Sequence, residues 1–273
     1  MRKLLLFISA LFLIHMSYGQ LTGIKSIPGD YATIEAAITA LNAQGVGAGG
    51  VTFNVAAGHT ETFTTVTAGL VTASGTAGNQ IIFQKSGAGA NPLITAATPG
   101  TGTMDYIICL SGADYVTFDG INVQENAANT TSAMQMEWAY AVLKASVDNG
   151  SQNNTIKNCA ISLNSDNTAS YAVYSNNHTP TSTTQLVIAD LAGTNSYNKF
   201  FGLNVSNTYH GFYLYGRADA TPFTYYDQGN ELGFGGANTV NGLGKASGTT
   251  HIWPLLLLSE QYQNCEQYLY RYM

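Results

Sequence analysis

The runs Phe118-Asp-Gly-Ile-Asn-Val123, Asn158-Cys-Ala-Ile-Ser-Leu163 and Phe200-Phe-Gly-Leu-Asn-Val205 are three copies of one pattern. Each run ends in an apolar–polar–apolar triplet, with a small residue just before it. The first apolar residue of the triplet recurs at intervals of 40 and then 42 residues. A strand that recurs at a nearly constant interval indicates a repeat architecture. The sequence therefore predicts a solenoid of stacked coils.

A second kind of strand alternates with the first. It is represented by Ala139-Tyr-Ala-Val142, Ser170-Tyr-Ala-Val173 and Gly211-Phe-Tyr-Leu214. Clusters of Gly, Asn, Ser and Thr separate the strands, as turns require, and no helical pattern lies between them. We predict one strand of each kind per coil. The alternative, a β-sandwich, would need tight Asn-Gly or Asp-Gly turns between paired strands, and the chain offers few.

Like residues of successive coils should stack above one another. We expect Ile121, Ile161 and Leu203 to stack inside, each contributing about 1.5–3 kcal/mol by burial. Asparagines at the predicted corners tolerate left-handed backbone and can form amide ladders between coils. The asparagines in question are Asn153, Asn154, Asn158 and Asn198. Further strands are expected within residues 81–95, 106–110 and 186–188.

Residues 20–50 should cap the first coil of a β-helix that spans residues 51–250. Asp30 is the expected N-cap of a helix with apolar residues at helical spacing. These apolar positions are Ile34, Ala37, Ile38 and Leu41. Such a helix would cover the otherwise open end of the core.

Both ends of the sequence differ from the rest. Residues 1–19 begin with the basic residues Arg2 and Lys3, continue with an apolar run and end with small residues. This order is typical of a secretory signal peptide, and the apolar run is too short to span a membrane. Residues 251–273 contain no Gly or Thr. They form either a terminal helix beginning near Pro254 or, as we prefer, a tail read out of frame. Strand-like sequence in the shifted frame would mean that the protein is truncated at its C-terminus.

The sequence resembles the right-handed parallel β-helix proteins of the pectate-lyase-like superfamily, particularly large secreted proteins of Bacteroidetes-type bacteria. The resemblance covers roughly residues 25–250. It is carried by the ranges 29–38, 51–58, 115–121, 154–158 and 211–216. It implies an all-β fold, a single-stranded right-handed parallel β-helix with an N-terminal capping helix. It does not imply one activity, because many functions share a fold.

Composition narrows the class of partner. The formal net charge is −6 and no basic stripe exists, so we expect no nucleic-acid partner. No second long apolar run follows the first residues, so we expect no membrane span in the mature protein. Cys109 and Cys159 read as small buried hydrophobes, with a disulfide between them left open. We expect a monomer that is secreted or held at the outer cell surface.

Candidate catalytic residues are few. Enzymes of the resembled superfamily gather acidic residues, either around Ca²⁺ in lyases or as an acid and base pair in hydrolases. The acidic residues of this sequence are scattered. The best constellation is His210, Arg217 and Asp219, where Arg217 could act as a base or a sugar-acid clamp. The opposing interpretation is a solvated loop after a strand. We expect no catalysis and no cofactor; Ca²⁺ is expected only if the protein is a lyase.

Aromatic residues suggest binding instead. Strand alternation places Tyr213 and Tyr215 on the face opposite Phe212 and Leu214. The matching strands carry further aromatic residues, namely Trp138, Tyr140, Tyr171 and Tyr174. An exposed row of rings could stack on sugars, whereas rings that stack on one another would be structural.

The sequence thus predicts a secreted or cell-surface β-helix protein, a non-catalytic scaffold for adhesion or for binding an extracellular polysaccharide or surface glycan. The alternatives are a polysaccharide lyase or glycoside hydrolase that acts on an acidic polysaccharide, and a purely structural surface module.

Overall fold

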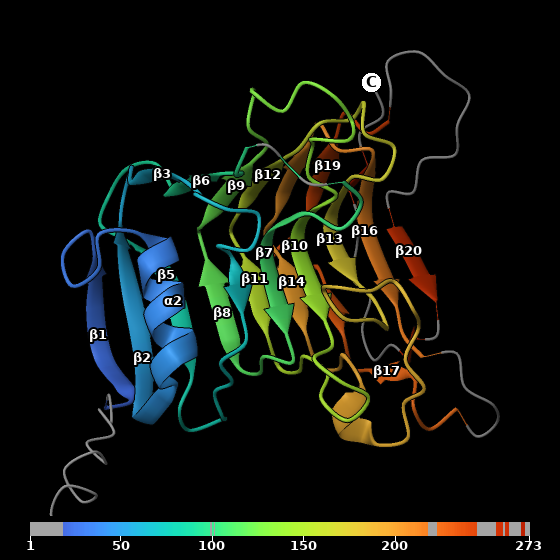
Figure 1. Cartoon of the computed structure of the whole chain (residues 1–273), viewed down its shortest axis with the longest axis horizontal. Coiled ribbons are helices and arrows are strands. Elements are labelled where there is room, and N and C mark those ends of the chain that lie inside the picture. The colour runs from blue at the N-terminus through green and yellow to red at the C-terminus, as the bar shows by residue number, and fades with distance from the viewer. Residues whose placement is uncertain are drawn as a thin grey trace, which may run out of the picture.

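The structure, a computed structural model, describes residues 19–98, 100, 102–217, 223–244, 255–258, 260–261 and 269–270. It is an all-β fold of three parallel sheets, with one capping helix, α2 (Ile34–Gln44), and a short 3₁₀ turn at Leu191–Gly193 (Figure 1). Residues 1–18 of the expected signal peptide lie outside the described residues. In the described part of the protein, no helix is long and apolar enough to cross a bilayer.

All but two of the described strands fall into three sheets, which we name A, B and C. Sheet A contains, in order, β1 (Leu21–Ile27), β2 (Val46–Ala56), β5 (Ile81–Ser86), β8 (Val116–Asp119), β11 (Thr155–Lys157), β14 (Lys199–Phe201) and β18 (Glu231–Leu232). Sheet B contains β3 (Thr60–Thr62), β6 (Leu93–Thr95), β9 (Asn122–Gln124), β12 (Ala160–Ser162), β15 (Asn204–Ser206), β19 (Thr239–Asn241) and β22 (Leu269–Tyr270). Sheet C contains β4 (Leu70–Val71), β7 (Tyr106–Ser111), β10 (Trp138–Leu143), β13 (Tyr171–Ser175), β16 (His210–Tyr215) and β20 (Leu255–Leu258). The strands β17 (Asp227–Gln228) and β21 (Glu260–Gln261) form a separate pair.

From β2 to β16 the backbone visits the sheets repeatedly in the order A, B, C, and each strand pairs in parallel with its counterpart in the next coil. This arrangement is compatible with a parallel β-helix or solenoid. Each full coil has three strands, so the prediction of two kinds of strand per coil was wrong. The run Phe118–Val123, expected to be one strand, is in fact shared between two strands, β8 and β9, which meet at a corner. Residues 186–188 form no strand.

The predicted stacking was wrong by two residues in the coil that contains Ile161. Ile161 pairs with Val123 on one side and Val205 on the other, rather than with Ile121 and Leu203. The position level with Ile121 and Leu203 is occupied by Cys159. A shift of two leaves every side chain on the same face, because strand side chains alternate with period two. The hydrophobic pattern therefore could not distinguish the two alignments.

The corners fix the alignment instead. The register Asp119↔Lys157↔Phe201 places the next residues, Gly120, Asn158 and Gly202, at one level. Their φ angles are 70°, 58° and 65°, a region that favours glycine and tolerates asparagine. The pattern of the three runs instead predicts Asn158 level with Phe118 and Phe200, which is wrong by two positions.

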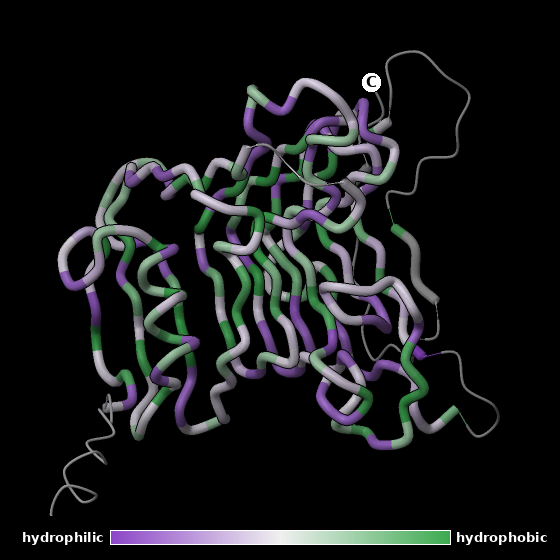
Figure 2. Tube along the Cα trace, viewed as in Figure 1, coloured by the Kyte–Doolittle hydropathy of each residue, from purple (hydrophilic) through white to green (hydrophobic). Residues whose placement is uncertain are grey.

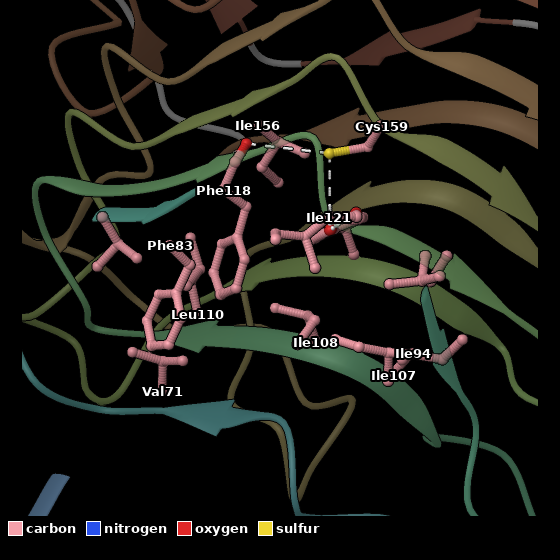
Figure 3. Close-up of a cluster of buried hydrophobic side chains, with 14 of the residues drawn as sticks. Val71, Phe83, Ile94, Ile107, Ile108, Leu110, Phe118, Ile121, Ile156 and Cys159 are labelled. Carbon is pink, nitrogen blue, oxygen red and sulfur yellow. Dashed lines mark hydrogen bonds between the residues drawn. The ribbon is translucent and has the colours of Figure 1, made fainter. Parts of the chain in front are cut away.

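The interior is a continuous apolar core between the three sheets. Phe53 stacks on Phe83 with ring centroids 4.4 Å apart, and Phe83 stacks on Phe118 at 5.0 Å. Figure 3 shows Phe83 and Phe118 beside Ile156 and Cys159 in this core. Figure 2 shows apolar and polar residues alternating along many strands, as expected when one face is buried. Cys159 lies in this core and Cys109 in a separate cluster on sheet C, and both are free thiols, so they form no disulfide.

Helix α2 covers the first coil as predicted, burying Ile34, Ala37, Ile38 and Leu41. Its N-cap is Thr33, whose side chain accepts from the Ala36 N–H. The prediction that Asp30 caps the helix was wrong, because the Asp30 carboxylate accepts from the N–H and hydroxyl of Ser26 instead. Strand β1, which pairs with β2, was not expected within the cap.

The tail is described only in part. Leu255–Leu258 forms β20, which pairs in parallel with β16, so this stretch is not the helix of the alternative interpretation. That residues 251–273 are read out of frame stays a prediction.

Candidate functional site

A polar groove of about 690 Å³ runs beside sheet B. One wall is the loop of residues 125–137 between β9 and β10, the green loop at the top of Figure 1. The groove is lined by Gln124, Glu125, Asn126, Ala127, Asn129, Thr130, Ser132, Gln135, Ser162, Leu163, Asn164, Asp166 and Asn207. These residues come from three successive coils, so the groove extends along the stacking direction.

The floor follows from strand alternation. Val123 and Ile161 point into the core, so their neighbours Gln124 and Ser162 point outward. Gln124 and Ser162 are paired in register, and Ser162 is paired in turn with Ser206 of the next coil. Of these three, Gln124 and Ser162 line the groove, so the floor presents an amide beside a hydroxyl at the spacing of parallel strands, about 4.8 Å.

The wall is fixed at both ends by one carboxylate. Glu125 Oε2 accepts from the Met136 N–H at 2.7 Å. Glu125 Oε1 accepts from the Asn126 N–H and from Asn129 Nδ2, both at 2.9 Å. The side chain thus joins the beginning, middle and end of the loop. Its burial raises the pKa of Glu125, while these hydrogen bonds act in the opposite direction.

Amide side chains connect the wall to both neighbouring coils. Asn126 and Asn129 donate to the carbonyls of Ala96 and Ala97 at 3.0 Å. From the other side, Asn167 donates to Glu137 Oε1 at 3.1 Å. These contacts make the wall a preorganised surface rather than a loose loop.

Two amide oxygens in the wall, Asn129 Oδ1 and Gln135 Oε1, are buried and have no hydrogen-bond partner within the described residues. Both side chains use their NH₂ groups to hold the loop together, Gln135 donating to the Asn129 carbonyl at 3.2 Å. Buried unpaired acceptors are uncommon and often mark a place for water or a ligand.

Behind the wall lies a second buried carboxylate, Glu137. It accepts from the Asp105 N–H at 2.9 Å and from Asn167. Burial raises the pKa of Glu137 to about 7, and the nearby Asp105 and Glu125 act in the same direction. Within the described residues, no group of three or more His, Cys, Asp or Glu side chains is arranged to hold a metal ion.

The predicted aromatic residues lie on sheet C rather than at this groove. Trp138 and Tyr174 stack with ring centroids 4.4 Å apart and planes 3° apart, and Tyr174 stacks on Tyr213 at 5.2 Å. Only 3% of Trp138 and 8% of Tyr174 is exposed, and His178 packs against both rings. Tyr213 is partly exposed, so the face becomes more open toward the later coils.

The other three predicted rings have different surroundings. Tyr140 is fully buried in the core, where its hydroxyl donates to the Ile121 carbonyl at 2.6 Å, so it presents no face to solvent. Tyr171 is partly exposed and stacks on His210 at 4.6 Å. Tyr215 is partly exposed and lies 6.2 Å from Tyr213, centroid to centroid.

The predicted catalytic constellation is not assembled in the described residues. His210 begins β16 and is buried, and burial lowers its pKa to about 4. Arg217 lies beyond the far end of the same strand, roughly 20 Å away at the rise of an extended backbone. Asp219 lies outside the described residues. The structure therefore does not bring His210 and Arg217 together.

Sequence reasoning missed the groove residues. The outward positions Gln124 and Ser162 carry a usable signal, since each alternates with a buried residue of the recurring triplet. The wall carries none, because its shape depends on contacts that Glu125 makes with residues up to eleven positions away.

Comparisons with known proteins return no match: no family model, no curated protein and no solved structure is similar to this protein.

Proposed function

We propose that the protein is an extracellular, non-catalytic glycan-binding scaffold built as a single right-handed parallel β-helix of the pectate-lyase-like kind. The handedness rests on the general rule that parallel crossover connections are right-handed in about 98% of cases. The extracellular location rests on the signal-peptide pattern of residues 1–19. The fold assignment rests on the repeated A, B, C order of the sheets.

The groove beside sheet B is the observation that supports glycan binding. Its volume lies within the range of about 300–1,000 Å³ that small ligands occupy. Gln, Asn, Ser and Thr side chains dominate its lining, and these groups both donate and accept hydrogen bonds, as sugar hydroxyls do. Its length across three coils suits a polymeric ligand better than a single compact one.

The hydrogen bonds and positions of the two carboxylates in the lining favour binding over cleavage. Both oxygens of Glu125 already accept hydrogen bonds that hold the wall. Asp166, the other acidic residue of the lining, is exposed. A glycosidase needs two carboxyl groups free to act across one sugar bond, as acid and as base or nucleophile. Glu125 has a structural role instead, so we assign the groove to recognition.

A matched pair of substitutions tests the proposal. Ser162→Tyr places a ring on the groove floor, and Ser206→Tyr places the same ring one coil further along, outside the lining. Binding is measured by calorimetry against cellohexaose, mannohexaose, xylohexaose, chitohexaose and hexagalacturonate, with circular dichroism as the folding control. We expect at least one hexasaccharide to bind, and Ser162→Tyr to weaken it more than tenfold while Ser206→Tyr changes it less than threefold.

The aromatic face of sheet C provides the competing location. Tyr213→Ala removes a partly exposed ring from that face without touching the groove. If Tyr213→Ala abolishes binding and Ser162→Tyr leaves it intact, the groove proposal is wrong and the rings carry recognition. Absence of binding to every hexasaccharide contradicts the glycan-binding function itself.

A further inference from the structure

The groove has acidic residues and no basic ones in its lining. Glu125 and Asp166 are its charged side chains, and no Lys, Arg or His is found among the described residues that form it. We infer that the groove selects neutral glycans and rejects polymers of uronic acids. The inference rests on the proposed function and names the ligand class for the same groove.

The negative charge of Glu125 is fixed in place. Three donors, on Asn126, Asn129 and Met136, hold its carboxylate at the wall. A ligand cannot displace this group without opening the loop. A uronate lying in the groove would therefore place its own carboxylate near a charge that cannot move away.

The basic residues of the neighbouring coils are occupied elsewhere. Lys157 pairs with Asp119 at 3.1 Å and Lys199 pairs with Glu231 at 3.2 Å, and both lysines belong to sheet A. Lys144 is fully buried beside Asp227 at the end of β10. None of these ammonium groups lines the groove. A bound carboxylate would therefore lose water without gaining a cation, which is unfavourable.

A neutral sugar meets no such barrier. Its hydroxyl groups can donate to carboxylate oxygens and can both donate to and accept from amides and hydroxyls. Gln124, Ser162 and Asn164 present such groups along the floor and its edge. The same lining that repels a uronate is thus compatible with a neutral hexose polymer.

The test compares mannohexaose or cellohexaose with hexagalacturonate, each titrated into the full-length protein at pH 8, low salt and in EDTA. EDTA removes divalent cations that could bridge carboxylates. We expect the better neutral hexasaccharide to bind at least tenfold more tightly than hexagalacturonate. Equal or tighter binding of hexagalacturonate overturns the inference while leaving the proposed function standing. Absence of binding by these sugars and by the other two hexasaccharides of the panel contradicts the proposed function.

Charge reversal at the rim provides the variant. Asp166 is exposed, so Asp166→Lys should fold. We expect hexagalacturonate binding to strengthen about 3- to 10-fold, as expected for two charge units across a few ångströms of solvated groove. Because Asp166 belongs to the lining, the readout is the ratio of the hexagalacturonate affinity to the neutral hexasaccharide affinity, which should rise. Asp148→Lys, on an exposed turn outside the lining, makes the same change in net charge and should alter neither. An equal gain in both variants would show a general charge effect and overturn the assignment to the groove.

Discussion

Asn198 lies one coil beyond Asn154, and its Oδ1 accepts the Asn154 backbone N–H at 3.0 Å. Asn230 repeats the relationship with the Asn198 N–H at 2.8 Å. Each side chain also donates from Nδ2 to a carbonyl, Asn154 to Ala113 and Asn198 to Ser151. The predicted amide ladder is thus present, and it satisfies buried backbone groups at a corner where no strand pairing is available.

Removal of one rung should be costly. Asn198→Ala leaves the buried Asn154 N–H and the Ser151 carbonyl without their partner, and we expect a loss of about 2–4 kcal/mol in the free energy of unfolding. Urea denaturation measures it. The control is Asn204→Ala, an exposed asparagine on β15, which should change stability by less than about 0.5 kcal/mol. Similar losses in both variants would contradict the role of the ladder.

Glu137 should make stability depend on pH. The folded protein keeps the Glu137 proton up to a pKa of about 7, whereas the unfolded protein releases it near 4.5. The folded state therefore binds more protons between these values, and stability falls as pH rises through this window. Glu137→Gln should remove this contribution, on the order of 1–2 kcal/mol after allowance for solvent screening. Urea unfolding of both proteins from pH 4 to 8 would show the difference, and parallel profiles would contradict it.

His210 should act in the opposite direction. Burial lowers its pKa to about 4, whereas the unfolded protein takes up a proton near 6.5. The unfolded state binds more protons between these values, so stability is lost as pH falls from about 6.5 toward 4. His210→Phe keeps a ring against Tyr171 and should flatten this part of the profile. An NMR titration of the imidazole checks the pKa directly, and an ordinary value near 6.5 would refute the prediction.

Tyr140 gives a test of the difference between core and binding rings. Tyr140→Phe removes the hydroxyl that donates to the Ile121 carbonyl in the interior, at an expected cost of about 1–2 kcal/mol in unfolding free energy. Because the ring is fully buried, hexasaccharide binding should be unchanged. Denaturation and calorimetry on one preparation measure both quantities. Weakened binding with unchanged stability would mean that the ring is accessible after all.

The residue types of the sequence were enough to predict an all-β repeat with a capping helix, and the burial of Ile34, Ala37, Ile38 and Leu41. They were not enough to align the coils, since a shift of two residues leaves the buried face of Ile161 unchanged. The prediction that Tyr140 belongs to an exposed row of rings was also wrong. Whether an aromatic side chain in a strand points inward or outward cannot be decided until the neighbouring strands are known. The positive φ of Asn158 matches that of Gly120 and Gly202 and gives the correct alignment, but φ is known only from the structure. An asparagine in a sequence can occupy several kinds of corner.

The all-β class of the fold could be predicted from the residues alone, because alternation and a recurring interval are local properties that each coil carries independently. The groove itself could not be located without the tertiary structure. The groove joins residues of three coils, and its wall exists because Glu125 contacts Met136 and because Asn126, Asn129 and Asn167 contact neighbouring coils. Such contacts depend on how the coils stack. The number of residues between two positions does not reveal whether those positions lie at the same level in neighbouring coils.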